Sequence, residues 1–115
     1  MTMNDSILDT IKCLLGNEYD DFNFDLIIHI NSALTVLRQI LPTGIRINAE
    51  GFRITGSTET WNQFVADGRY LDEIKTYVYL KVKKVFDPPQ NSSHLTALDE
   101  ALKEYEWRLS VEKID

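Results

Sequence analysis

The run LDEIKTYVYLKV, residues 71–82, decides the fold of this chain. Its apolar residues and those just after it recur at the spacing of one helix face: Leu71, Ile74, Val78, Val82 and Val85. The second half of the run is also rich in β-branched and aromatic residues, which favours a strand. The length and the longer period favour a helix over about residues 70–86. Because apolar side chains occupy much of its circumference, we expect it to be the central helix of a small bundle.

The sequence after this helix predicts one further helix. Asp87-Pro88-Pro89 ends the central helix, because a residue before proline is pushed out of the helical region. We expect the last helix to run from Ser93, its N-cap, to about Lys113. A narrow packing seam is formed by Leu95, Leu98, Leu102, Tyr105 and Leu109. Trp107 lies about 200° around the helix from Tyr105 and is therefore off this seam. Its side chain either makes a contact with another protein or packs under its own chain.

Two helices are expected before the central one. The first covers about residues 6–15, with Ser6 and Asp9 matching a capping box and Gly16 able to end it in a left-handed conformation. The second covers about residues 21–41, where apolar residues recur at the positions of one helix face. Both therefore have one side suited to packing against the central helix.

The segment between the second and the central helix changes period. Apolar and polar residues alternate over residues 45–55, and Gly51 divides them into two runs, which predicts a short β-hairpin. Trp61, Phe64 and Val65 then predict a helical turn that fills the core. The expected fold is mostly α: a single domain, residues 1–115, with four to five helices in a bundle and a β-hairpin insertion.

Composition limits the class of protein. The 115 residues are 43% hydrophobic and carry a net charge of −6, which is ordinary for a globular domain. The first 25 residues hold six acids and one base, so specific nucleic-acid binding is not expected. No apolar run is long enough for a membrane helix, and no secretory signal is evident. Cys13, the only cysteine, is expected to be a small buried hydrophobe in a reducing cytosol.

The sequence offers no catalytic or metal-binding motif. His29 and His94 lie in different segments with no partner nearby in sequence, and a structural role is expected for His29. Residues 21–25 begin like a calcium-binding loop, but Leu26 stands where the loop needs glycine and Ser32 where it needs glutamate. We therefore expect no enzyme, no cofactor and no metal site.

Several segments, in their order and spacing, resemble small head–tail connector proteins of phages and prophages of Gram-positive hosts. The segments are Ile30–Leu37, Gly51–Thr55, Thr58–Trp61, Leu71–Val82, Phe86–Ser92 and Tyr105–Leu109. The resemblance spans about residues 5–112. It implies a non-enzymatic adaptor of the virion neck, assembled in the host bacterial cytoplasm. Such adaptors form a ring, typically dodecameric, beneath the portal protein and around the DNA exit channel, and they carry a stopper or tail-completion protein.

Candidate interface residues follow from charge, from the expected hairpin and from the exposed tryptophan. They are Asp20, Asp21, Arg46, Arg53, Trp107 and Arg108. We expect the acidic N-terminal region to face the portal or the channel lumen. The alternative is a small phage-encoded regulatory protein that binds a host protein through this acidic face. An enzyme without a familiar motif is the third and least favoured reading.

Overall fold

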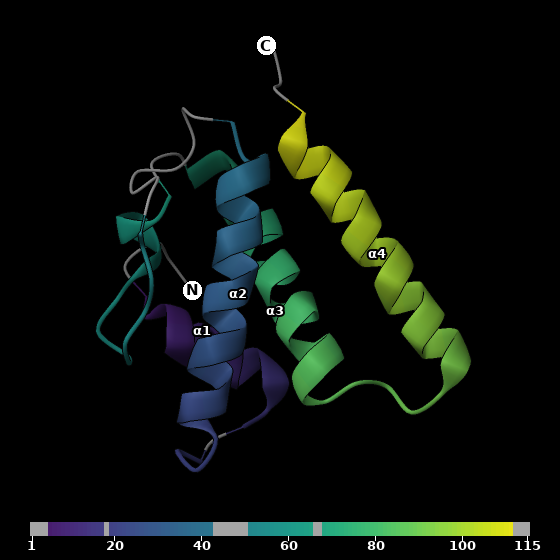
Figure 1. The fold of residues 1–115 in the computed structure, drawn as a ribbon, viewed down its shortest axis with the longest axis horizontal. Coiled ribbons are helices and arrows are strands. Elements are labelled where there is room, and N and C mark those ends of the chain that lie inside the picture. Colours follow the sequence, from purple (N-terminus) through teal and green to yellow (C-terminus); the bar gives the residue numbers. More distant parts are fainter. Residues whose placement is uncertain (1–4, 18, 43–50, 66–67, 112–115) are drawn as a thin grey trace.

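A computed structural model describes residues 5–17, 19–42, 51–65 and 68–111. These residues form four α-helices and two short 3₁₀ helices (Figure 1). The elements are α1 (Ile7–Leu15), α2 (Asn23–Ile40), η1 (Trp61–Gln63), η2 (Gly68–Tyr70), α3 (Leu71–Phe86) and α4 (Ser92–Ser110). The mostly helical bundle predicted from the sequence is confirmed, whereas the predicted hairpin is not.

Helix α3 lies at the centre of the bundle and packs against α1, α2 and α4 (Figure 1). Its buried residues are Leu71, Ile74, Lys75, Tyr77, Val78 and Val82. They cover more than one face, because α3 has neighbours on several sides. The predicted stripe ends at Val82, since Val85 is 58% exposed.

Helix α4 runs back along α3 at the edge of the molecule (Figure 1). The predicted seam is confirmed: Leu98, Leu102 and Leu109 are buried, and Leu95 and Tyr105 are half-buried. The helix begins one residue earlier than predicted, and its N-cap is Asn91 rather than Ser93. The Asn91 side chain accepts hydrogen bonds from the backbone N–H groups of Ser93 and His94, at 2.7 and 3.3 Å.

The predicted ends of α1 are confirmed. The Ser6 hydroxyl accepts a hydrogen bond from the Asp9 backbone N–H at 3.2 Å, and Gly16 closes the helix with a left-handed φ of 74°. Cys13 is exposed, so the prediction of a buried cysteine was wrong. Cys13 lies two residues beyond the buried Ile11 and therefore points about 200° away from it.

The hairpin prediction fails at residues 51–55, which form no strand in the described structure. Ile54 is fully buried, and its backbone bonds to the side chain of Asn31 on α2. The Ile54 N–H donates to Asn31 Oδ1 at 2.8 Å, and Asn31 Nδ2 donates to the Ile54 carbonyl at 3.0 Å. The asparagine amide therefore takes the place of a partner strand. The first predicted strand falls on residues 45–50, which lie outside the described residues.

The helical turn at residues 61–65 fills the core as predicted. Trp61, Phe64 and Val65 have no exposed surface. The Trp61 indole Nε1–H donates to the Thr10 hydroxyl of α1 at 3.1 Å, and Phe64 stacks near Phe52 with 5.4 Å between ring centroids. This packing holds the segment before α3 against the bundle, beside α2.

Candidate functional site

The predicted interface residues lie on three separate surfaces. Asp20 and Asp21 belong to the loop between α1 and α2, Arg53 lies beside the middle of α2, and Trp107 and Arg108 belong to α4. Arg46 falls outside the described residues. The structure therefore does not gather the predicted residues into one site, and each surface is considered in turn.

The acidic loop is anchored through Asp20. The Lys12 ammonium, on a side chain that is almost buried, donates to the Asp20 carboxylate at 2.6 Å. This hydrogen bond and the positive charge of Lys12 lower the pKa of Asp20, and the Asn23 amide adds to the effect. Asp21 is exposed, and none of the described ion pairs includes it. Asp20 is thus partly neutralised by Lys12, whereas Asp21 has no such ion pair among the described residues.

Aromatic side chains flank these acids on the outside of the molecule. Phe24 is 75% exposed, and Tyr19 is exposed to a similar degree. Phe22 packs edge-on against Phe86 at the end of α3, with 5.5 Å between ring centroids. Exposed aromatic rings beside charged groups are common at protein interfaces, so this loop is a candidate contact surface.

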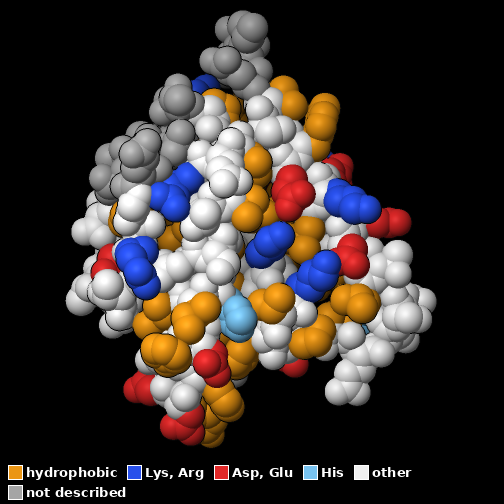
Figure 2. Space-filling view, viewed as in Figure 1, with side chains coloured by type: hydrophobic (Ala, Val, Ile, Leu, Met, Phe, Trp, Pro, Cys, Tyr) orange, Lys and Arg blue, Asp and Glu red, His pale blue; other side chains and the backbone are white. Residues whose placement is uncertain are grey.

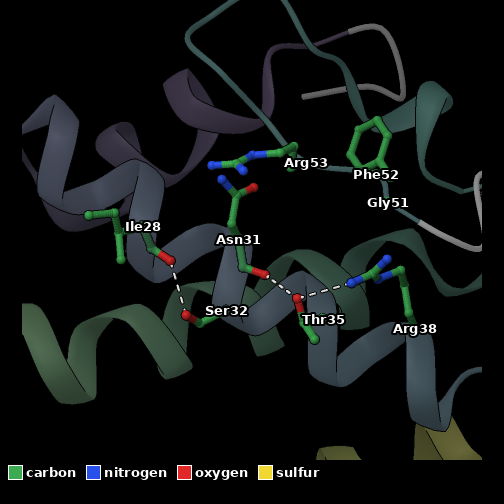
Figure 3. Close-up of a pocket in the computed structure, with 8 residues that line it drawn as sticks. All are labelled: Ile28, Asn31, Ser32, Thr35, Arg38, Gly51, Phe52 and Arg53. Carbon is green, nitrogen blue, oxygen red and sulfur yellow. Dashed lines mark hydrogen bonds between the residues drawn. The ribbon is translucent and has the colours of Figure 1, made fainter.

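A pocket of about 370 Å³ opens between α2 and the segment 51–53 (Figure 3). Its lining residues are Ile28, Asn31, Ser32, Thr35, Arg38, Gly51, Phe52 and Arg53. None of these lining residues is acidic. The pocket is open to solvent and combines two guanidinium groups with hydroxyl, amide and apolar surface.

Arg38 is the residue of this pocket that sequence reasoning missed. Its Nη2 donates to the Thr35 hydroxyl at 3.2 Å, and that hydroxyl donates to the Asn31 carbonyl at 2.9 Å (Figure 3). The Arg38 Nε is buried and has no hydrogen-bond partner among the described residues. Neither Arg38 nor Arg53 takes part in an ion pair between described residues. Figure 3 shows the two guanidinium groups at different sides of the pocket, so each is available to a carboxylate or another anion separately.

Arg38 lies four positions after the buried Leu34, about 40° from it around α2, so it stands at the edge of the buried side of the helix and is half-buried. Helical periodicity therefore does not mark it as a contact residue. Arg53 is distant in sequence, and the Asn31–Ile54 contact holds its segment beside α2. The pocket could therefore not be predicted from helical periodicity alone.

The outward face of α4 carries the third surface. Trp107 is 67% exposed, so it is not packed under residues of its own chain. Arg108 forms an i,i+4 ion pair with Glu104 at 3.1 Å. Val111 is exposed just beyond the helix. A large exposed indole beside a charged pair matches the composition of protein–protein contacts.

The described residues give little sign of catalytic or metal chemistry. Within them, no three histidine, cysteine or acidic side chains come together to hold a metal ion, and His29 and His94 lie on α2 and α4. The helices that the structure describes include none long and apolar enough to span a membrane. Figure 2 shows basic side chains across the middle of one face of the molecule, with acidic ones both at its lower end and among the basic ones on the side of α4.

Comparison with known proteins assigns the chain to a protein family. The sequence pattern of a family described as phage connector protein matches residues 7–114. No curated protein and no solved structure shows a significant match. The family match spans nearly all of the bundle, including the three surfaces described above. The chain therefore belongs to the phage connector protein family.

Proposed function

We propose that this protein is a head-completion adaptor of a tailed phage or prophage, a single connector-like domain that forms a ring beneath the portal protein. The ring surrounds the DNA exit channel in the virion neck and presents a platform to a stopper or tail-completion protein. The observation that carries this proposal is the family match over residues 7–114. Membership in a family of structural phage proteins also points to a non-enzymatic protein.

The structure supports the proposal by offering a rigid body with separate contact surfaces. Helix α3 is enclosed by α1, α2 and α4, and the core extends through Trp61 and Phe64. Trp107 and the Arg38–Arg53 pocket lie on different elements. A ring subunit needs two different lateral surfaces and at least one axial surface, and three candidate surfaces are available here.

The charge of the chain suits a channel through which DNA passes. The net charge is −6, and the surface acids include Asp20 and Asp21. An acidic wall repels phosphate groups and so does not retain DNA in transit. In the ring, the acidic loop would face the lumen or a basic surface of the portal.

The exposed acidic and aromatic loop also favours a second candidate function. Asp21 and Phe24 are the kind of pair that a basic, partly apolar surface of another protein recognises. A small phage-encoded regulator that binds a host protein through this loop would use the same residues. Such a protein would bind its target with one-to-one stoichiometry and would not assemble on a portal.

Native mass spectrometry of the protein with the portal protein encoded beside it tests the proposal. We expect a complex with about one adaptor per portal subunit, as in a ring built on a symmetric template. No association at any mixing ratio would overturn the adaptor function and favour the host-binding regulator.

A further inference from the structure

One end of the bundle exposes large apolar side chains beside acidic ones. This loop end consists of residues 19–25, from the α1–α2 loop into the first turn of α2, and residues 85–87, where α3 ends. Tyr19 is 73%, Phe24 75% and Val85 58% exposed. The start of α2 and the end of α3 lie at the same end of the molecule (Figure 1), and Figure 2 shows hydrophobic and acidic side chains gathered there. Apolar groups gathered in this way, unlike single ones, mark a contact surface.

The loop end is held in place by contacts within the chain. The Phe22 ring packs edge-on against Phe86, with 5.5 Å between ring centroids, and so joins the start of α2 to the end of α3. Asp20 accepts from the Lys12 ammonium at 2.6 Å through its carboxylate, and from the Asn23 backbone N–H at 3.2 Å through its carbonyl. The exposed side chains therefore stand on a fixed backbone, which lowers the cost of ordering them when a partner binds.

The charge that remains without a partner at the loop end is negative. Asp21 and Asp25 are exposed, and the described ion pairs include neither of them. The lysines of this region, Lys12 and Lys83, already pair with aspartates, at 2.6 and 3.7 Å. A complementary partner therefore brings positive charge.

The acids stand next to the apolar groups around α2. At 100° per residue, Asp25 lies about 100° from Phe24 and about 60° from Ile28 around the helix, and Ile28 is 47% exposed. All three belong to the same outward side of the first two turns. A partner that satisfies this side must present a cation and a large apolar group close together, as an amphipathic basic segment does.

We propose that the loop end docks an amphipathic basic segment of another protein, one that places lysine or arginine beside large apolar side chains. Charge complementarity selects this occupant. Nucleic acid and anionic membrane surfaces are repelled by Asp21 and Asp25, and the loop end of a second copy would bring like charges together.

This inference deepens the proposed function by giving the chemistry of what contacts the loop end, and it rests on that function in taking the partner to be a protein. A wall that only repels DNA needs acids, whereas exposed rings such as Phe24 are stabilised by burial against a partner. The loop end of an adaptor would thus face another protein and not the channel lumen. The chemistry is tested on the free chain, so its failure would leave the portal complex unaffected.

Calorimetric titration of the free chain with synthetic peptides tests the proposal. The probe is a helical peptide of leucine and lysine, and its two controls replace every lysine with glutamate or every leucine with serine. We expect the leucine–lysine peptide to bind at least about tenfold more tightly than either control, and to bind less tightly as salt is added. No binding, or equal binding of the serine–lysine peptide, would overturn the proposal.

Variants of the chain locate the contribution of each group. Asp25→Lys and Phe24→Ser should each weaken binding of the leucine–lysine peptide by about fivefold or more, whereas Phe24→Leu should retain most of it. Glu100→Lys makes the same charge change as Asp25→Lys at an exposed site on α4 and should weaken binding far less. Circular dichroism checks the helices, and Asp21→Lys replaces Asp25→Lys if the latter does not fold. Equal losses for Glu100→Lys and the charge variant of the loop end would overturn the proposal.

Amide chemical shifts of the ¹⁵N-labelled chain show where the peptide binds. Shifts on addition of the leucine–lysine peptide should be concentrated in residues 19–25 and 85–87, with α4 little changed. Shifts centred on α4, or on the pocket between α2 and residues 51–53, would overturn the assignment of the docking site to the loop end.

Discussion

The side-chain amide of Asn31 is bonded to both backbone polar groups of Ile54, at 2.8 and 3.0 Å. These two hydrogen bonds connect α2 to a segment more than twenty positions later in the chain, and Ile54 is fully buried. The contact also brings Arg53 to the edge of the pocket on α2. Asn31 therefore supports both the packing of this segment and the position of a candidate contact residue.

Replacement of Asn31 by leucine should destabilise the protein by about 2–4 kcal/mol, because two buried backbone groups would lose their partners. Urea unfolding followed by circular dichroism measures the loss. Ser32→Ala is the matched control, since Ser32 is the exposed neighbour on α2 and its removal should cost less than about 0.5 kcal/mol. Equal stability of the two variants would show that the Asn31–Ile54 contact contributes little.

Tyr77 and Glu106 predict a loss of stability at alkaline pH. The Tyr77 hydroxyl donates to the Glu106 carboxylate at 2.8 Å. Burial raises the pKa of Tyr77 well above its ordinary value of 10.0, and the hydrogen bond and charge of Glu106 raise it further. Above pH 10 the unfolded chain loses this proton while the folded chain keeps it, so the free energy of unfolding falls as pH rises.

Unfolding of wild type and Tyr77→Phe at several pH values between 8 and about 11 tests this effect. The variant should lose about 1 kcal/mol at pH 8, where the hydrogen bond is intact in the wild type. Above pH 10, the free energy of unfolding of the variant should fall less steeply than that of the wild type. Parallel curves for the two proteins would contradict the raised pKa of Tyr77.

Asp20 predicts the opposite behaviour in acid. Its pKa is lowered chiefly by the hydrogen bond from Lys12, so the pair stabilises the folded state above the ordinary aspartate pKa of 3.8. This stabilisation is lost as pH falls through the lower folded pKa. Asp20→Asn should therefore flatten the decline of stability between about pH 5 and pH 2. Asp21→Asn is the control and should follow the wild-type curve, because no described ion pair includes Asp21.

Helical periodicity predicted the bundle well because most of the apolar positions that it identified on the helices are buried. The central helix and the seam of α4 were both correct for this reason. The alternation of apolar and polar residues over 52–55 led to the wrong prediction of a strand. The buried backbone groups of Ile54 need hydrogen-bond partners, but these partners need not belong to a strand. Asn31 supplies them from α2. A side-chain-to-backbone contact over such a sequence distance has no periodic signal.

The candidate surfaces also divide into features that helical periodicity indicates and features that depend on tertiary contacts. Trp107 lies off the seam of α4, and this position left open whether it makes a protein contact or packs under its own chain; its 67% exposure decides against the second alternative. The Arg38–Arg53 pair depends on the tertiary contact at Ile54, so the sequence identified Arg53 as a candidate without its neighbour. The same holds for Asp20, whose charge was visible in the sequence but whose partner Lys12 was not.

Trp107 and Trp61 predict opposite effects when each is replaced by alanine. Trp61 is fully buried and donates to Thr10, so Trp61→Ala should destabilise the fold by about 3–5 kcal/mol. Trp107 is 67% exposed, and Trp107→Ala should change stability by less than about 0.5 kcal/mol. Thermal unfolding of both variants measures this difference.

The exposed tryptophan should instead matter for assembly. If α4 contacts the portal or a neighbouring subunit, Trp107→Ala should reduce the yield of the portal complex in native mass spectrometry, because a buried indole is a common energetic centre of an interface. Lys103→Ala is the matched control, since it removes another exposed side chain one turn earlier on α4. Complex yields that stay at the wild-type level for Trp107→Ala would exclude this face of α4 from assembly, leaving the α1–α2 loop and the Arg38–Arg53 pocket as the remaining candidate surfaces.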